Sequence, residues 1–452
     1  MKLVTATLLL LVGAGAAGAQ PLMDYVNAPD STFRWSVDEV TEQLGTKLVK
    51  IDMVSQTWQG VEWDHQLWIL MPDDLEDADL ATLVITGGEP DMTYLMLGSQ
   101  LVNESNCIFA VLGGIPKQPL YGGLKEDALI AYTFVKLLET GDATWPLLFP
   151  MTKSAVRAMD AVEGYLAEQE GHHLQGFITT GASKRGWTTW LSGVVDERVI
   201  GIAPIVYDNL NLPAQMKQQM DVYGADSEQI DDYTEFDLQD RLQSAEGAEL
   251  GRIVDPYTYR HRITEPKLIL VGSNDPYWTL ESAKLYFDHL AGPAAILYFP
   301  NGGHDLGGIE PALNRLKPSL LAFIEHVAGR TPWPEMDWSI SPTAGRVALA
   351  MKTDIDPERW GIWVATSNVE DFRSAEWHYF GFDEDGEPVS PGGDAPQLRF
   401  RGTEATYGAD AVRTITVEES PAPYMAVFGE MRWEIDGNPL ILTTVADIVK
   451  RP

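Results

Sequence analysis

Short apolar runs that alternate with helical stretches constrain the fold of residues 45–330 more than any other sequence feature. A strand that is apolar along its whole length is buried on both faces, as in a parallel sheet covered by helices. Two runs that alternate polar and apolar residues, 48–54 and 66–70, instead predict a hairpin at the sheet edge. The predicted class is α/β with a mostly parallel sheet. Buried strands are expected at 81–86, 107–112, 176–180, 199–206, 267–271 and 295–298, and helices at 126–139, 152–168, 184–194, 280–289 and 311–328.

Two segments depart from this alternation. Residues 209–262 are polar, acidic and helical in composition and lie between two predicted strands, so we expect an insertion that caps one end of the sheet. After Pro332 and Pro334, short strands broken by Gly, Pro and Asp turns follow. The sequence therefore predicts an α/β domain over residues 20–332 and a C-terminal all-β sandwich over 338–449. The sandwich strands are expected at 347–351, 360–366, 425–432 and 441–445.

The first 19 residues have the pattern of a secretory signal peptide. Lys2 precedes a short apolar run, and Ala17-Gly18-Ala19 supplies the small residues that a signal peptidase recognises. The apolar run is too short to span a bilayer. We therefore expect an exported protein, periplasmic or extracellular, without a membrane anchor.

The charge balance excludes two classes of partner. The 452 residues include 66 Asp and Glu against 32 Lys and Arg, which gives a formal net charge of −34. Such a chain repels nucleic-acid phosphates and anionic lipid headgroups, so we expect neither as a partner. The acidic segment 224–240 falls in the predicted cap, where it would disfavour anionic substrates. The single cysteine, Cys107, excludes an intrachain disulfide.

The stretch Gly181-Ala182-Ser183-Lys184-Arg185-Gly186 joins a predicted buried strand to a predicted helix. A serine on a sharp strand-to-helix turn has the geometry of a nucleophile elbow, which exposes Oγ above the sheet. The usual motif has glycine two residues after the serine, whereas Arg185 occupies that position here. Taken alone, the pattern fits equally well a serine that caps a helix.

Two later loops supply the partners that a nucleophilic serine needs. Asp275 follows the predicted strand 267–271, and His304 lies in a glycine-rich loop after the predicted strand 295–298. Functional residues of open α/β sheets gather at the carboxyl ends of strands, and serine, acid, histidine is the chain order of α/β-hydrolases. The imidazole must take the serine proton and the carboxylate must orient the imidazole, so Ser183, His304 and Asp275 form a candidate catalytic triad.

Two backbone N–H groups are candidate donors to the oxyanion that such a reaction develops. The first belongs to Lys184, directly after the serine, and the second to Gly88, in the glycine turn after the strand 81–86. The alternative interpretation of the glycine turn is the simple end of a strand.

Other residues at the same predicted edge complete the site. Asp208 follows the strand 199–206 and is an alternative acid, while Tyr277 and Trp278 adjoin Asp275 and are candidate pocket residues. His172-His173 lacks nearby cysteines or spaced acids. Because the sequence also has no phosphate-binding glycine loop, dinucleotide fingerprint or EF-hand, we expect neither a metal nor a cofactor.

The chain resembles the PhoPQ-activated pathogenicity-related proteins, a bacterial and protist family assigned to the α/β-hydrolase superfamily. The resemblance implies an exported protein with a hydrolase core and an appended β domain. It rests on strings spread over nearly the whole chain: Asp24-Tyr25-Val26, Trp145-Pro146-Leu147-Leu148-Phe149-Pro150-Met151-Thr152-Lys153-Ser154, the stretch from Gly181 to Trp187, Asp255-Pro256-Tyr257, Asp371-Phe372-Arg373 and Tyr424-Met425-Ala426-Val427-Phe428.

The elbow is also similar to the Gly-x-Ser-Arg-x-Gly elbow of glucuronoyl esterases, in which the basic residue after the serine helps to hold the oxyanion. This resemblance implies the same role for the Lys184 side chain. The alternative is a lysine that faces solvent in the first turn of a helix.

The sequence as a whole predicts an exported serine hydrolase that cleaves an ester or an amide in a small-molecule or peptide substrate. The candidate substrates are a peptide and a carbohydrate or lipid (acyl) ester. The alternative, from a different class, is a non-catalytic secreted binding or signalling protein on a hydrolase scaffold, because fold alone does not define function. The sequence leaves open the choice between peptidase and esterase, and also the oligomeric state.

Overall fold

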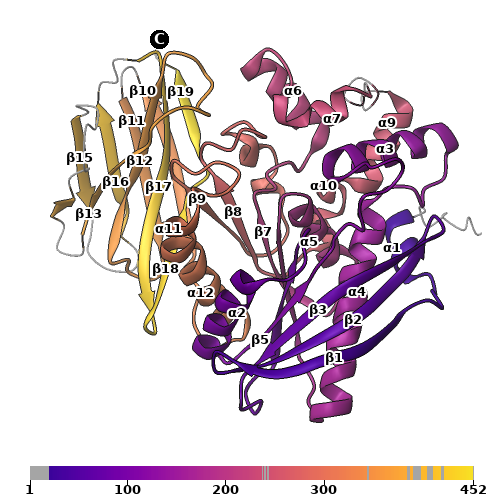
Figure 1. Cartoon of the computed structure of the whole chain (residues 1–452). Helices are drawn as coiled ribbons and strands as arrows, with labels where there is room; N and C mark the ends of the chain where they lie inside the picture. Colours follow the sequence, from indigo (N-terminus) through magenta and orange to yellow (C-terminus); the bar gives the residue numbers. More distant parts are fainter. Residues whose placement is uncertain are drawn as a thin grey trace, which may run out of the picture.

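A computed structural model of the chain shows one long mixed sheet flanked by helices and a second, smaller sheet (Figure 1). In the part of the chain that the structure describes, the long sheet has 15 strands in the order β1-β2-β3-β5-β4-β6-β7-β8-β9-β18-β17-β12-β13-β14, with β19 paired to β17. The described residues are 20–236, 238, 241, 244–343, 346–383, 387–389, 399–404, 411–418 and 422–450. The predicted signal peptide, residues 1–19, lies outside them.

The centre of the long sheet is parallel, as the apolar runs predict. These strands are almost wholly buried because both of their faces are apolar. The strands are β4 (Leu80–Ile85), β5 (Ile108–Leu112), β6 (Gly176–Ala182), β7 (Val199–Ile205), β8 (Lys267–Gly272) and β9 (Ala294–Phe299).

Antiparallel strands precede this centre. The predicted hairpin is confirmed as β2 (Thr46–Trp58) paired with β3 (Val61–Met71), but its position at the sheet edge is wrong because β1 (Arg34–Gln43) pairs with the outer side of β2. Most residues of β1 are exposed, so this strand has no apolar face by which a sequence pattern could reveal it.

Helices cover both faces of the sheet. On one face lie α1 (Pro21–Asn27), α3 (Glu126–Thr140), α4 (Leu148–Tyr165) and α5 (Lys184–Val195), and on the other lie α2 (Met92–Ser105) and α12 (Lys317–Val327). The turns η1 (Leu166–Glu170), α11 (Ile309–Pro311) and η6 (Ala312–Leu316) adjoin α4 and α12. None of the helices within the described ranges is long and apolar enough to cross a membrane.

The predicted helix at 280–289 is wrong. Two short 3₁₀ turns, η4 (Ser282–Leu285) and η5 (Phe287–His289), take its place. Between them Tyr286 has φ −146° and ψ −25°, a backbone conformation that is neither helical nor extended. This conformation buries the tyrosine ring fully and lets its hydroxyl donate a hydrogen bond to Asp208 Oδ1 at 2.7 Å. Tertiary packing therefore overrides the helical composition of this segment.

The segment between β7 and β8 forms short helices beyond the ends of these strands (Figure 1). Residues 237, 239, 240, 242 and 243 of this segment lie outside the described residues. The elements of the segment are α6 (Leu212–Tyr223), η2 (Glu228–Ile230), α7 (Asp231–Thr234), α9 (Ala245–Val254), α10 (Pro256–Tyr259) and η3 (Arg260–Arg262).

The C-terminal strands form two sheets that share buried apolar residues. The first continues the long sheet through β12 (Arg359–Ser367), β13 (His378–Phe382), β14 (Pro388–Val389), β17 (Tyr424–Ile435), β18 (Asn438–Thr443) and β19 (Asp447–Lys450). The second contains β10 (Met336–Thr343), β11 (Arg346–Thr353), β15 (Arg399–Glu404) and β16 (Arg413–Glu418).

The junction between the two halves of the long sheet corrects the prediction of a mostly parallel sheet. Strand β18 pairs antiparallel with β9 at Thr443 and Ile296. The Thr443 hydroxyl accepts a hydrogen bond from the Tyr298 N–H and donates one to the Ile296 carbonyl, each at 3.0 Å. This pairing covers the edge that β9 would otherwise expose, so the sheet continues as a mixed one.

Candidate active site

Ser183 lies on a strained turn between β6 and α5. Its backbone has φ 58° and ψ −122°, a conformation that costs a residue with a side chain free energy and is typical of functional sites. The Ser183 N–H donates to the Ile205 carbonyl at 2.9 Å, which ties the turn to the neighbouring strand β7. The Ser183 side chain does not cap the helix. The capping interpretation of this serine is therefore wrong.

Close packing around the elbow explains why positions 181 and 186 are glycines. A Cβ atom at Gly181 would lie 2.9 Å from the Ile85 carbonyl oxygen, and one at Gly186 would lie 2.8 Å from Cβ of Tyr207. Both contacts are too short for any side chain. The backbone after the serine therefore packs most closely at Gly186, one residue later than in the usual motif. Position 185 has room for a side chain, here that of Arg185.

The Arg185 side chain braces the elbow from the side of α3. Its Nε donates to the Ile115 carbonyl at 2.5 Å, and its two terminal nitrogens donate to Glu126 at 2.6 and 2.7 Å. Burial would raise the pKa of Glu126, but the hydrogen bonds and charge of Arg185 outweigh it and lower this pKa to about 2. Glu126 is therefore ionised at neutral pH and forms a bidentate ion pair.

The structure brings the three predicted triad residues into one hydrogen-bonded chain. Nε2 of His304 lies 2.9 Å from Ser183 Oγ, and Nδ1 of His304 lies 2.8 Å from Asp275 Oδ2. Because a carboxylate only accepts, Nδ1 carries the proton, which leaves Nε2 of the neutral ring as the acceptor for the Ser183 hydroxyl. This is the tautomer that a general base needs.

Packing holds the chain in place. The Asp275 side chain is 6% exposed, and its Oδ1 accepts from the Tyr277 N–H at 2.9 Å. The Tyr277 ring lies over the His304 ring with 4.1 Å between centroids. Tyr277, predicted as a pocket residue, thus contacts the histidine as well as lining the cavity.

The alternative acid, Asp208, does not contact His304. It is fully buried, and its recorded partner is the Tyr286 hydroxyl. Burial, opposed in part by the Tyr286 hydrogen bond and assisted by the nearby charge of Asp275, raises the pKa of Asp208 to about 7. The geometry therefore assigns the histidine to Asp275, and Asp208 forms a second, separate carboxylate site.

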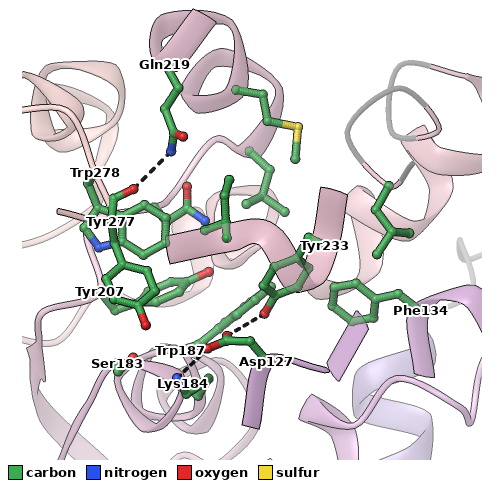
Figure 2. Close-up of a pocket in the computed structure, with 15 residues that line it drawn as sticks. Asp127, Phe134, Ser183, Lys184, Trp187, Tyr207, Gln219, Tyr233, Tyr277 and Trp278 are labelled. Carbon is green, nitrogen blue, oxygen red and sulfur yellow. Dashed lines mark hydrogen bonds and ion pairs between the residues drawn. The ribbon is translucent and has the colours of Figure 1, made fainter. Parts of the chain in front are cut away.

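Ser183 lines a cavity with a mainly apolar wall (Figure 2). The space inside it is about 720 Å³, part of it open to solvent. Both Tyr277 and Trp278 line it, as predicted. Its other aromatic and aliphatic walls are Phe134, Trp187, Tyr207, Leu212, Met216, Ile230, Tyr233 and Leu238.

The charged side chains of the cavity wall neutralise each other. Nζ of Lys184 lies 2.7 Å from Asp127 Oδ2, and the Tyr233 hydroxyl donates to Asp127 Oδ1 at 2.9 Å. Figure 2 shows Asp127 between the lysine and the tyrosine. The Lys184 side chain is 12% exposed, so the solvent-facing alternative is wrong. The helix N-terminus leaves the Lys184 N–H without an intrahelical acceptor, as an oxyanion donor requires.

Several predicted features lie apart from the cavity. Gly88 is absent from the described residues that line it, and its carbonyl accepts from the Gly114 N–H at 3.0 Å. His172 Nε2 contacts the Ala78 carbonyl at 3.0 Å. Within the described ranges, no group of three or more His, Cys, Asp or Glu side chains could hold a metal ion. Burial raises the pKa of the Cys107 thiol, which packs in the core.

Sequence reasoning missed two polar residues of the site. Asp127 lies in the first turn of α3 and Tyr233 in α7, 56 and 50 residues from Ser183 along the chain. The segment around Tyr233 was expected to cap the sheet, yet no motif marks this tyrosine or Asp127. Only the fold brings them to Lys184.

The elbow, followed in chain order by an acid and a histidine at the ends of later strands, is the arrangement of an α/β-hydrolase. The chain belongs to the PhoPQ-activated pathogenicity-related protein family, whose model matches residues 22–373. A curated relative, autocrine proliferation repressor protein A of Dictyostelium discoideum, is 32% identical over 393 residues, which cover 81% of this chain and 78% of that protein.

Solved structures with low sequence identity also match the chain. An acetyl xylan esterase from Paenibacillus sp. R4 has a TM-score of 0.46 and 14% identity, covering 68% of this chain and 92% of its own. A glucuronoyl esterase from Solibacter usitatus has a TM-score of 0.41 and 12% identity, covering 68% and 91%. The family assignment rests on the sequence matches.

Proposed function

We propose that this protein is a serine hydrolase that cleaves an ester or an amide through an acyl-enzyme on Ser183. The observation that carries the proposal is the continuous chain from Ser183 Oγ through His304 to Asp275, with hydrogen bonds of 2.9 and 2.8 Å, on a strained elbow that opens into a cavity.

The reaction follows from the direction of these hydrogen bonds. Ser183 Oγ attacks the substrate carbonyl carbon while its proton passes to Nε2 of His304, and the carbonyl electron pair moves to oxygen. The tetrahedral intermediate then collapses, and the leaving alcohol or amine takes the proton from His304. Water attacks the acyl-enzyme with the same proton transfers, which releases the acid and restores Ser183. Asp275 orients the imidazole and stabilises its charged form.

The developing oxyanion needs preorganised donors. We assign the first to the Lys184 N–H at the start of α5, and we propose the Gly88 N–H in the turn after β4 as the second. The Lys184 side chain also lies on the cavity wall, where it forms an ion pair with Asp127. Neither donor requires a metal or another cofactor.

The cavity wall favours a substrate whose acyl group is apolar and uncharged. Aromatic and aliphatic side chains dominate the wall, and the lysine and aspartate on it form an ion pair. Asp231 and Asp232 lie on α7, the helix that carries the cavity residue Tyr233, and would repel anionic substrates further. A small ester or a short peptide fits this description, with no nucleic-acid or lipid partner.

We propose that the protein is exported, on the pattern of residues 1–19. In this proposal residues 20–332 form the hydrolase domain with a cap at about 209–262, and residues 338–449 form a β sandwich from the second sheet and the strands that continue the long sheet. The shared buried residues of the two C-terminal sheets support the sandwich.

A fluorophosphonate probe tests the catalytic proposal because it reacts with activated serines. We expect labelling of the purified protein at Ser183, located by peptide mass mapping, and its loss in Ser183→Ala. Ser55→Ala is the matched control, because Ser55 Oγ also lies 2.9 Å from a histidine nitrogen, that of His65, but is fully buried. A folded wild-type protein without labelling at Ser183 would contradict the proposal.

The name of the Dictyostelium discoideum relative, autocrine proliferation repressor protein A, supports a second candidate. In this alternative the protein is a secreted signal on a hydrolase scaffold, and its effect on cells does not need Ser183. The two candidates separate in a proliferation assay with wild-type protein and with the Ser183→Ala variant. An equal effect of both proteins would favour the signalling function.

A further inference from the structure

The loop that carries Asp275 is fastened to the C-terminal region. Asn274, the residue before the acid, donates from Nδ2 to the Ala375 carbonyl at 2.7 Å and to the Phe372 and Arg373 carbonyls at 3.3 Å each. These carbonyls belong to one stretch between β12 and β13, residues 372–377, which we name the clamp segment. The side-chain amide of Asn274 therefore donates to three backbone carbonyls about 100 residues further along the chain.

The loop that carries His304 is fastened to the same clamp segment. Asn301 accepts from the Trp377 N–H through Oδ1 at 2.7 Å and donates from Nδ2 to the Trp377 carbonyl at 3.1 Å. The pair of bonds resembles one rung of a sheet. Asn301 has φ 61°, a conformation that asparagine tolerates better than most residues.

The two loops are also bonded to each other at these asparagines. The Asn274 N–H donates to the Gly302 carbonyl at 2.9 Å, and the Asn301 N–H donates to Ser273 Oγ at 2.9 Å. The Ser273 hydroxyl in turn donates to Asn274 Oδ1 at 2.6 Å. The acid loop, the histidine loop and the clamp segment therefore form one hydrogen-bonded unit.

The clamp segment is itself firmly held. Phe372 and Trp377 are each 2% exposed, and the Trp377 ring packs on Phe428 of β17 with 4.8 Å between centroids. On its other side Arg373 stacks over Tyr223 of α6 at 3.8 Å from the ring centroid. Contacts to β17 and to α6 give the segment a fixed position, so it can impose that position on the two loops.

We infer that Asn274 and Asn301 are positioning residues through which the C-terminal region holds Asp275 and His304 in line with Ser183. This inference rests on the proposed function of the triad. The amides touch neither substrate nor the reacting atoms, so they act on turnover through the geometry of the triad. A misplacement of about 1 Å in a reacting geometry costs on the order of 100-fold in rate.

Two variants test the inference. Asn274→Ala removes the donors to the clamp segment, and Asn301→Gly removes the second amide while glycine still adopts the positive φ. We expect either variant to lower kcat by about 10- to 100-fold, with KM changed less than threefold. Asn103→Ala is the matched control. The Asn103 amide, on α2, also donates to a backbone carbonyl, that of Leu44 at 3.1 Å, but Leu44 lies on the exposed β1–β2 turn away from the triad. We expect this variant to have wild-type kcat.

A cycle with Asp275→Ala separates positioning from a general loss of structure. If Asn274 acts through Asp275, adding Asn274→Ala to Asp275→Ala lowers the rate of fluorophosphonate labelling at Ser183 less than twofold. An equal loss in both backgrounds, or wild-type kcat in both single variants, would overturn the inference. If Asn274→Ala does not fold, Asn301→Gly combined with His304→Ala provides the corresponding cycle, because Asn301 is in the histidine loop.

A proton NMR measurement keeps the inference separate from the proposed function. The proton between His304 Nδ1 and Asp275 gives a downfield resonance, identified by its loss in Asp275→Ala. We expect this resonance to broaden or shift in Asn274→Ala and Asn301→Gly, whether or not the protein turns over a substrate. A wild-type protein without labelling at Ser183 refutes the proposed function alone, whereas an unchanged resonance in both asparagine variants refutes the inference alone.

Discussion

Among the residues that the structure describes, two serine–histidine pairs have the same 2.9 Å separation, but their surroundings differ in the features that matter for catalysis. Ser183 meets His304 at the cavity, and Ser55 meets His65 between the N-terminal strands and α4. Both histidines present Nε2 to the serine oxygen. The distance between the two side chains therefore does not by itself define a nucleophile.

The third partner and access to solvent separate the two pairs. Nδ1 of His65 contacts the Gly113 carbonyl at 3.1 Å, where His304 has the Asp275 carboxylate. Ser55 is fully buried, and His65 is 4% exposed. Burial lowers the pKa of His65 to about 4, because the Gly113 hydrogen bond and the charge of Asp64 offset only part of the cost of a buried imidazolium. A histidine that resists protonation cannot serve as a strong base.

The largest expected effect comes from removing the Asp275 carboxylate, the partner that the Ser183–His304 pair has and the Ser55–His65 pair lacks. Asp275→Asn keeps the size of the side chain but disfavours the tautomer with a proton on Nδ1, so we expect kcat to fall by about 10⁴-fold. Steady-state kinetics on an activated ester measures this effect. Asp208→Asn is the comparison, and we expect kcat within about threefold of wild type. An equal fall in Asp208→Asn would make Asp208 the functional acid.

A second prediction uses the pKa of His65. Since folding lowers this pKa from 6.5 to about 4, neutral His65 contributes stability above pH 6.5 that is progressively lost as the pH falls toward 4. His65→Gln removes this dependence. We expect the free energy of unfolding of wild type, relative to the variant, to decrease by about 3 kcal/mol between pH 7.5 and 4.

Urea denaturation at the two pH values measures this difference, and any constant effect of the substitution cancels from it. The exposed His173 supplies the control variant His173→Gln, for which we expect the same difference at both pH values. A difference for His65→Gln that does not change with pH would show that the histidine titrates normally in the folded protein.

The third prediction concerns the brace that supports the Ser183 elbow, which the Ser55 pair lacks. Glu126→Ala leaves the Arg185 guanidinium, 10% exposed, without its carboxylate. We expect the free energy of unfolding to fall by about 2 kcal/mol, less than for a fully buried pair because 38% of the Glu126 side chain is exposed.

Glu139→Ala on the same helix is the matched control for this brace. Glu139 pairs with Lys136 at 2.8 Å, but its side chain is 51% exposed, so we expect a much smaller change in the free energy of unfolding than for Glu126→Ala. Urea denaturation compares the two variants. Equal losses would mean that the Arg185 ion pair contributes no more than a surface pair.

The smallest expected effect concerns the cavity that only Ser183 faces. Tyr233→Phe removes the hydrogen bond from α7 to Asp127 while the ring stays on the cavity wall. This hydrogen bond contributes about 1 kcal/mol to the position of the cavity wall. Without it we expect KM to be about fivefold higher, with little change in kcat. Tyr25→Phe, which loses a hydroxyl bond to Gln56 at 2.8 Å away from the cavity, is the control. A wild-type KM in Tyr233→Phe would show that the Tyr233 hydroxyl does not contribute to substrate binding.

Much of the fold was predictable because its signals are local. Apolar runs predicted the parallel strands, and the turn chemistry around Ser183 predicted the elbow. Strand β1 and helix α2 escaped prediction, and 280–289 was predicted as a helix although the Tyr286 backbone is not helical. In that segment a buried ring and one hydrogen bond to Asp208 decide the conformation, and neither has a signal in the local sequence.

The candidate site divides in the same way. The chain order of Ser183, Asp275 and His304 follows from strand ends, so the sequence alone identified all three. It did not distinguish Asp275 from Asp208, because each aspartate follows a buried strand. Their separate partners, His304 and Tyr286, lie in distant parts of the chain.

The sequence by itself determined the α/β class, the elbow and the three residues of the candidate triad, because each depends on neighbours within a few residues. The tertiary structure decided how these residues are held. It joined β18 to β9, paired Lys184 with Asp127, and fastened the acid and histidine loops to the clamp segment 372–377. Such contacts join residues that the chain separates widely, so their free energy depends on the folded arrangement and has no counterpart in a local pattern.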